Sequence, residues 1–253
     1  GPDDALSTTN IAGFFKYKKI FNEDLIILPS IRLHHYGDLQ ETVIEPRLGA
    51  KYNINEWFRL KFADGFYSQS FISAFSDRDV VNYFYGFLLA PDNLPDDFNG
   101  EDITTKLQKA KHLITGIEFD IGNFSFFNIE GYYKWFDQLT NLNRNKIFDD
   151  NDNFADEPDY LKSDYIVETG DAYGINFHFT YEKRPYYFWV VYDYAHVNRQ
   201  YIDKYGELSA YQPNWDRRHN VQFLANYVLG DKNPFEFSLR WNFGSSLPFT
   251  LQQ

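Results

Sequence analysis

Residues 217–249, RRHNVQFLANYVLGDKNPFEFSLRWNFGSSLPF, decide the fold of this chain. Apolar residues occupy every second position of two segments: Val221, Phe223, Ala225, Tyr227, Leu229, then Phe235, Phe237, Leu239, Trp241, Phe243. Polar residues alternate with them: Asn220, Gln222, Asn226, Glu236, Ser238, Arg240, Asn242. Since successive side chains of a strand point to opposite faces, the pattern predicts two strands, each with one apolar and one polar face. Strands of this length with an aromatic apolar face are typical of a transmembrane β-barrel wall.

The composition of the whole chain agrees with this class. Aromatic residues make up 20% of the 253 residues, yet the hydrophobic fraction is only 43%. Barrel strands alternate apolar and polar residues, so such a chain is not apolar on average. No segment approaches the roughly 18 consecutive apolar residues that a membrane-spanning helix needs.

Charge and cysteine content exclude other classes. The formal net charge is −12, which argues against a nucleic-acid partner, because phosphate binding needs clustered Lys and Arg. The chain contains no cysteine, so we expect neither disulfides nor a thiolate metal site.

Alternating segments between turn signals predict about ten antiparallel strands. They lie near 9–21, 25–37, 43–53, 57–70, 111–122, 124–138, 165–182, 186–199, 217–229 and 235–247. Most exceed the roughly 9–11 residues that a tilted strand needs to cross a bilayer, whereas strands of soluble proteins average about 5–6.

The predicted connections alternate between two kinds. Short turns lie at 22–24, 53–56, 122–123, 183–185 and 231–233. The other connections are 38–42, 71–110, 139–164 and 200–216, of which all but the first are long. Short turns at one end and long loops at the other are typical of outer-membrane barrels.

The alternation also predicts which side chains face the barrel lumen. The inward set comprises Glu45, Arg47, Gly49, Lys51, Arg59, Lys61, Tyr67, Gln69, Asn128, Glu130, Lys134, Gly174, Asn176, His178 and Thr180. Both charge signs occur, so we expect ion-pair ladders or contacts with material that fills the lumen. Segment 186–199 is apolar in both phases, and its faces cannot be assigned.

The predicted strand directions place both ends of the ten-strand series on the long-loop side. A barrel threaded from the periplasm normally keeps its ends on the short-turn side. We therefore interpret residues 1–253 as a single segment of a larger barrel, without a plug domain or signal peptide. A closed ten-stranded barrel is the alternative.

No enzyme motif stands out. His34 is predicted to face inward and His35 outward, so the two do not form a metal site. The sequence Asp216-Arg217-Arg218-His219 lies where a long loop enters a strand, and no G-x-S-x-G serine accompanies it. We expect no catalytic residues.

The long loops carry acidic and aromatic residues. The acidic positions are Asp92, Asp96, Asp97, Glu101, Asp102, Asp149, Asp150, Asp152, Asp156, Glu157 and Asp159. Closely spaced carboxylates can bind Ca²⁺, although DDNDNFADEPD lacks the EF-hand spacing, and a solvated acidic loop is the simpler interpretation. Aromatic residues that could line a ligand-binding lip are Phe71, Phe75, Tyr83, Phe84, Tyr85 and Phe87.

Seven blocks together resemble the barrel of TonB-dependent outer-membrane receptors, in the subgroup with a carboxypeptidase-regulatory-like N-terminal domain. They are VIEPRLGAKYNI (43–54), FADGFYSQSF (62–71), AKHLITGIEFDIG (110–122), IEGYYKWFDQL (129–139), ETGDAYGINF (168–177), QPNWDRRHNVQF (212–223) and SLRWNFGSSLPFT (238–250). The resemblance implies a barrel of about 22 strands in the outer membrane of a Gram-negative bacterium. It also implies a plug domain, energy supplied through TonB, contact with outer-membrane lipid and a surface lipoprotein partner.

Residues 1–253 contain no plug, no TonB-contacting segment and no final strands with a terminal aromatic residue. We therefore expect them to form the later-middle part of such a receptor, which imports a nutrient. Two other functions remain open: a complete passive channel or adhesin of ten strands, and a soluble β protein that binds glycans. The predicted ligand-contacting residues are the inward positions nearest the long loops, namely Gln69, Lys134, Arg218 and Asn220.

Overall fold

The computed structural model describes residues 9–37, 39–70, 72–73, 88–89, 91, 93–230 and 232–248. Its main feature is one twelve-stranded sheet in which every neighbouring pair is antiparallel. The prediction of an all-β antiparallel fold is therefore confirmed. No helix within the described ranges is long and apolar enough to cross a membrane.

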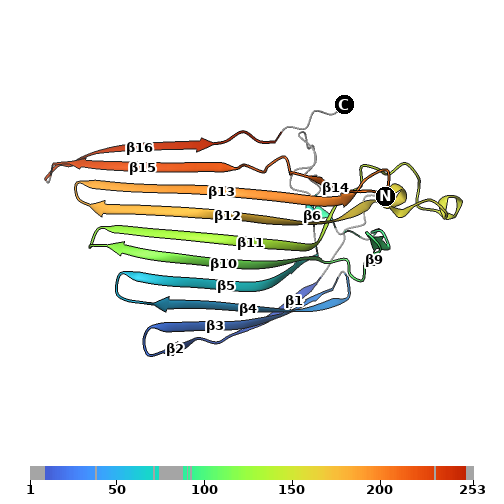
Figure 1. Cartoon of the computed structure of the whole chain (residues 1–253), viewed down its shortest axis with the longest axis horizontal. Helices are drawn as coiled ribbons and strands as arrows, with labels where there is room; N and C mark the ends of the chain where they lie inside the picture. The colour runs from blue at the N-terminus through green and yellow to red at the C-terminus, as the bar shows by residue number, and fades with distance from the viewer. Residues whose placement is uncertain are drawn as a thin grey trace.

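The sheet follows the order β1-β3-β4-β5-β10-β11-β12-β13-β15-β16, with β2 beside β3 and β14 beside β13 (Figure 1). The strand bounds are β1 Asn10–Lys16, β2 Lys19–Phe21, β3 Leu25–Tyr36, β4 Glu41–Asn53, β5 Phe58–Gln69, β10 Gln108–Ile121, β11 Ser125–Leu142, β12 Tyr165–Lys183, β13 Tyr186–Ile202, β14 Leu208–Tyr211, β15 His219–Leu229 and β16 Phe235–Gly244. Along this path each strand pairs with the next, so the ten predicted segments form one meander.

Small elements occupy the connections between these strands. They are β6 Ile72–Ser73, β7 Leu88–Leu89, β8 Asp97–Phe98, β9 Glu101–Asp102, η1 Asp152–Phe154 and α1 Asp159–Lys162. Strands β6 and β7 form one two-stranded sheet, and β8 and β9 form another. The sequence alternation predicted none of these elements, because each is only two to four residues long.

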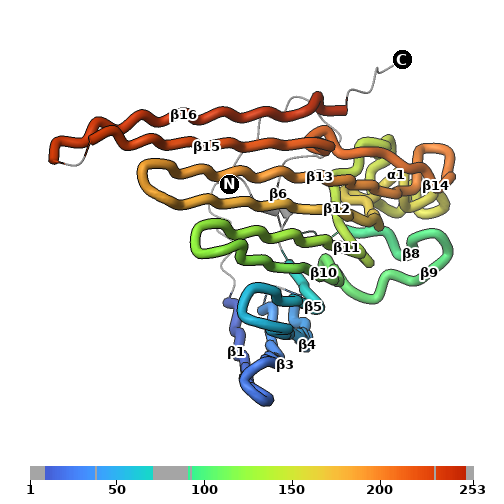
Figure 2. Tube along the Cα trace, turned by 60° about the vertical axis from the view of Figure 1, so that its left-hand side comes forward, coloured from blue at the N-terminus to red at the C-terminus, as the bar shows by residue number. Residues whose placement is uncertain are grey.

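The two ends of the sheet differ as expected. The connections β2–β3, β4–β5, β10–β11, β12–β13 and β15–β16 are short and lie together at the left end of Figure 1. The described parts of the long connections, including α1, β9 and β14, lie at the other end, here called the loop end (Figures 1 and 2). Positive φ angles at Asn22 (48°), Glu23 (66°) and Gly122 (60°) show how two of the short turns reverse the chain.

Three strand predictions need correction. The segment 9–21 is broken into β1 and β2 by Tyr17 and Lys18. Strand β11 continues to Leu142, beyond the predicted end at 138, and a register shift between Phe136 and Leu139 interrupts its ladder with β12. The loop 200–216 contains a further strand, β14, paired with β13.

The sheet is curved: in Figure 2 the strands β1, β3, β4 and β5 are seen nearly end-on, while β10 to β16 run across the view. Within the described ranges, β1 pairs only with β3 along the sheet path and β16 only with β15. The two terminal strands of the path are therefore open edges there.

Fully buried side chains gather at the loop end. They include Tyr36 at the end of β3, Leu107 before β10, and Ile166, Val167 and Glu168 at the start of β12. The remainder of the sheet is a single layer, and all ten residues of β16 are exposed. The buried core thus lies at the loop end, while the rest of the sheet has no second layer packed on either face.

Candidate functional site

One face of the sheet is polar along its length, and we call it the polar face. The ladder aligns one row of its side chains across eight strands: Lys51, Lys61, Gly116, Glu130, Asn176, Asp193, Asn220 and Gly244. The next row toward the short turns holds Arg59, Glu118, Asn128 and His178. The residues of these two rows that the sequence predicted to face inward all lie on this face. The prediction of which side chains share a face is therefore correct for these strands.

The centre of this network is Glu118 on β10. Its carboxylate accepts hydrogen bonds from Lys51 Nζ at 2.8 Å and Arg59 Nε at 2.9 Å. Lys61 Nζ lies 3.1 Å from its second oxygen. The Glu118 side chain is only 12% exposed, so one carboxylate holds three cations from two neighbouring strands at a partly dehydrated position.

Two further acids complete the network. Asp120 pairs with Arg59 at 2.5 Å, and Glu130 pairs with Lys61. Asn128 accepts a hydrogen bond from Lys61 Nζ at 2.7 Å. The three acids and three bases balance in charge, and the ion-pair ladder expected from the mixed signs is present.

The opposite face is apolar, and we call it the outer face. A row through its middle consists of Leu60, Ile117, Ile129, Phe177, Tyr192, Val221 and Phe243. On β16, for example, the side chains of Phe237 (60% exposed), Leu239 (59%) and Trp241 (51%) lie on this face. The ladder also resolves β13: Phe188, Val190 and Tyr192 lie on the outer face, and Trp189, Val191 and Asp193 on the polar face.

The four predicted ligand residues occupy separate positions. Lys134 lies between His112 and Ala172, with its ammonium group 5.2 Å from the centre of the Tyr132 ring. Gln69 lies opposite Gln108. Four strands, β10 to β13, separate β5 from β15 and therefore Gln69 from Asn220.

Arg218 and Asn220 lie together at the entrance of β15, and each contacts an acid. Arg218 Nη2 is 3.1 Å from Asp216 Oδ2, and Asn220 Nδ2 donates to Asp193 Oδ2 at 3.3 Å. Asn176 donates to the other oxygen of Asp193. The four residues therefore do not converge on one binding position.

The segment Asp216–His219 has no triad geometry. Asp216 pairs with Arg218, while His219 Nδ1 lies 2.9 Å from the hydroxyl of Tyr192 on another strand. His34 and His35 fall on alternate faces, as predicted: the His34 ring lies 3.9 Å from the Tyr36 ring, and His35 Nδ1 lies 2.9 Å from Thr42 Oγ1.

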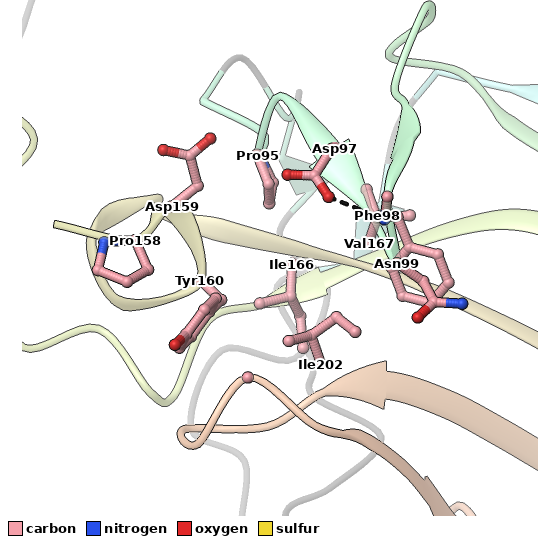
Figure 3. Close-up of a pocket in the computed structure, with 12 residues that line it drawn as sticks. Pro95, Asp97, Phe98, Asn99, Pro158, Asp159, Tyr160, Ile166, Val167 and Ile202 are labelled. Atoms are coloured by element: carbon pink, nitrogen blue, oxygen red, sulfur yellow. Dashed lines mark hydrogen bonds between the residues drawn. The ribbon is translucent and has the colours of Figure 1, made fainter. Parts of the chain in front are cut away.

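A cavity of about 400 Å³ lies among the connections at the loop end (Figure 3). The β8–β9 hairpin, α1 and the adjoining parts of β12 and β13 enclose it, through Pro95, Asp97, Phe98, Asn99, Gly100, Pro158, Asp159, Tyr160, Ile166, Val167, Ile202 and Gly206. Figure 3 shows Tyr160 and Asn99 on opposite sides of Ile166 and Ile202. The lining combines apolar side chains such as Ile166 and Ile202 with polar ones such as Asn99 and Asp159. Small-molecule sites also combine an apolar lining with a small number of polar groups.

Hydrogen bonds join the loops around this cavity. Asn93 donates from its side chain to Asp150 Oδ2 at 2.8 Å and accepts from the backbone N–H of Asp164 at 3.1 Å. Asp159 Oδ2 accepts from the backbone N–H of Asp96 at 3.0 Å. Several acidic residues of the loops therefore join segments about 60 residues or more apart in the chain.

Gly206, in the turn after β13, lines the cavity. Asp203 shapes this turn, because its carboxylate accepts from the N–H groups of Glu207 (3.0 Å) and Tyr205 (2.8 Å) and from the Ser209 hydroxyl (3.0 Å). These bonds, that from Glu207 foremost, hold the pKa of Asp203 below its ordinary value.

Gly206 itself has a φ of +78°, and a Cβ there would lie 3.0 Å from the Tyr160 hydroxyl. We expect Gly206→Ala to open this turn and to speed tryptic cleavage after Lys204 about tenfold, since left-handed backbone strain costs about 1–3 kcal/mol. Gly100→Ala is the matched control, because Gly100 has a φ of +82° and open space around its Cβ position. Gly100→Ala should leave cleavage after Lys204 unchanged, and equal cleavage of the two variants would show that strain at residue 206 does not open this turn.

The acidic loops are the places where a Ca²⁺ site was considered from the sequence. No group of three or more His, Asp or Glu side chains converges as a metal site within the ranges that the structure describes. Asp92 lies outside those ranges, as do all six aromatic residues of the predicted lip, Phe71, Phe75, Tyr83, Phe84, Tyr85 and Phe87.

Sequence reasoning missed the cavity at the loop end. Its walls come from four separate segments, each without a motif, and their proximity depends on the long-range bonds of Asn93 and Asp159. The prolines, glycines and aromatic residues of 95–100 and 158–160 were the only signal in the sequence. No family model matches this chain, and no curated protein matches it with significance.

Proposed function

We propose that this chain forms part of the wall of an outer-membrane β-barrel, and that the barrel belongs to a TonB-dependent importer of a nutrient. The observation that carries the proposal is the contrast between the two faces of one continuous sheet. The polar face holds an ion-pair network. The outer face carries a row of large apolar side chains across seven strands, exposed at Leu60 (37%) and Phe243 (47%) and partly exposed between them.

An apolar face of this extent suits lipid better than water. Exposed apolar patches on soluble monomers rarely exceed a few hundred Å². In a bilayer the same face needs no cover, provided that every backbone polar group is paired within the sheet. The eight longest strands of the sheet have 11 to 19 residues, which is sufficient to cross the hydrocarbon core.

Aromatic residues on the outer face support this orientation. The ring centres of Tyr186 and Tyr227 lie 5.3 Å apart beside the short turns. Nearer the loop end, the ring centres of Tyr133 and Trp135 lie 4.4 Å apart. Such rings favour the two interfaces of a membrane. Lys111 lies opposite Trp135 and forms an exposed ion pair with Asp137, two residues beyond Trp135, which suits a level of the outer face that meets water.

The open edges favour a larger barrel over a closed pore of ten strands. An unpaired strand edge does not face lipid, because its N–H and C=O groups would have no partners. Strands β1 and β16 therefore need additional wall on both sides. The blocks that resemble TonB-dependent receptors favour the importer class, whose plug and TonB supply energised transport and whose loops contact a surface lipoprotein.

The experiment is an uptake comparison in the source bacterium. We expect the protein in the outer-membrane fraction, and we expect deletion of its gene to abolish uptake of one nutrient from a panel. That uptake should stop when a protonophore removes the proton-motive force. Uptake that survives the protonophore would indicate the passive channel instead, and a water-soluble secreted protein would indicate the glycan-binding alternative.

A further inference from the structure

A second hollow lies on the polar face and is lined by β1, β3, β4 and β5. These four strands form one end of the sheet (Figure 2). Its volume is about 510 Å³. Its floor is a register row of Leu28, Gly49 and Ala63. Because Gly49 and Ala63 have short side chains, they leave free space between the taller rows above and below them.

The row above this floor is basic. Lys16, Ser30 and Arg47 are aligned across β1, β3 and β4. The same row continues through Gly65 to His112 and Lys134 and contains no carboxylate. This row therefore lacks the balance of acids and bases that the network around Glu118 has.

Two carboxylates border the hollow, and one is already saturated. Glu45 is 3% exposed and accepts from the Ser68 N–H at 2.8 Å, the Ser68 hydroxyl at 2.6 Å and Arg47 Nη2 at 2.8 Å. Asp64 is the other, and it lies at an alternate position of β5. Three cations, Lys16, Arg32 and Arg47, line the same hollow.

Arg32 is the cation without a counter-ion. Arg32 is a partly buried residue and lies opposite Glu45 in the ladder, yet its side chain has no hydrogen-bond or ion-pair partner among the described residues. Arg59 on the same face, by contrast, contacts both Glu118 and Asp120. A partly dehydrated charge without a partner is costly, and a guanidinium offers paired donors that match a carboxylate or phosphate.

The hollow has an aromatic wall as well as a basic rim. Phe14 lies opposite Arg32 in the ladder and is 83% exposed. Together with the 510 Å³ volume, this ring provides room for the planar or apolar body of a ligand beside its charged group.

We propose that this hollow binds a small organic oxyanion, a carboxylate or a phosphate monoester, whose charged group is held by Arg32 with Lys16 and Arg47 and whose planar body lies against Phe14. The proposal goes beyond the importer function and rests on the side chains of β1, β3, β4 and β5 alone. Loss of anion binding and loss of nutrient uptake are thus separate results.

The test is titration calorimetry of the full chain in detergent, with inorganic phosphate, phenyl phosphate and benzoate as probes. We expect Arg32→Gln to weaken phenyl phosphate binding by about tenfold or more. Arg240→Gln is the matched control, because Arg240 lies on the polar face of β16, at the opposite edge of the sheet. Phe14→Ala should reduce the affinity for phenyl phosphate to that for inorganic phosphate.

A variant that keeps every charge distinguishes the contribution of the hollow's shape to binding from that of its charges. Ala63→Leu should fill the floor of the hollow and remove phenyl phosphate binding, while the circular dichroism spectrum stays that of the parent. The proposal is overturned if the parent protein binds none of the three probes, if Arg32→Gln binds phenyl phosphate as the parent does, or if Arg240→Gln weakens binding equally.

Discussion

Val221→Arg should lower the free energy of unfolding in phospholipid vesicles by about 2–4 kcal/mol, the cost of an arginine on the lipid face near the middle of a bilayer. Val221 lies on β15 in the middle row of the outer face, between Tyr192 and Phe243. A guanidinium there would have lipid on one side and apolar neighbours on the other. The measurement is guanidinium chloride unfolding, followed by tryptophan fluorescence.

The adjacent position provides the control. Gln222 lies on the polar face of the same strand, opposite Val191 and Asn242. Gln222→Arg should change the free energy of unfolding by less than about 0.5 kcal/mol, as is usual for substitutions that face water. Equal losses in both variants would contradict the assignment of the outer face to lipid.

Glu118→Ala should cost about 2–3 kcal/mol in the same unfolding experiment. The substitution leaves Lys51, Arg59 and Lys61 close together without the carboxylate that they share. Breaking a buried ion pair costs about 3–5 kcal/mol, and the exposure of the three cations reduces that value here.

Glu236→Ala is the matched control for this prediction, since Glu236 is an exposed acid on the polar face of β16. A second test uses Lys51→Ala in the Glu118→Ala background. The loss in the double variant should be smaller than the sum of the two single losses, because the residues interact. Additive losses would show that the network is not coupled.

The strand order was predictable because most of the wall repeats one simple pattern. In β16 the apolar residues from Phe235 to Phe243 alternate without exception, and the turn before it is rich in polar residues. Such alternation fixes both the strand and its phase. The polar row from Lys51 to Asn220 follows from those phases together with the order of the meander.

The failures of prediction have local causes. Strand β13 contains Trp189, Val191 and Ala195 on one face and Phe188 and Val190 on the other, so hydrophobicity carries no phase information there. Only pairing with β12 and β15 determines its faces. The irregularity in the ladder between Phe136 and Leu139 is a property of two paired strands and leaves no trace in the alternation of either.

Neither hollow was predictable from single strands. The cavity at the loop end depends on bonds such as that from Asn93 to Asp150, which join residues 57 positions apart. The hollow beneath Arg32 depends on which small residues the ladder aligns, here Gly49 with Ala63. The alternation assigns Gly49 to a face but does not identify its neighbours.

The central claim is that this sheet is a barrel wall with one face in lipid. The most direct measurement is a single-cysteine scan of residues 173–180 on β12, a strand in the interior of the sheet. No native cysteine of residues 1–253 competes for the label. A fluorophore would be attached at each position in outer-membrane vesicles that contain a nitroxide-labelled lipid.

The expected result is strict alternation. Lipid nitroxide should quench the label at Tyr173, Ile175, Phe177 and Phe179, and it should spare the label at Gly174, Asn176, His178 and Thr180. Equal quenching at all eight positions, or no quenching at any of them, would contradict the claim.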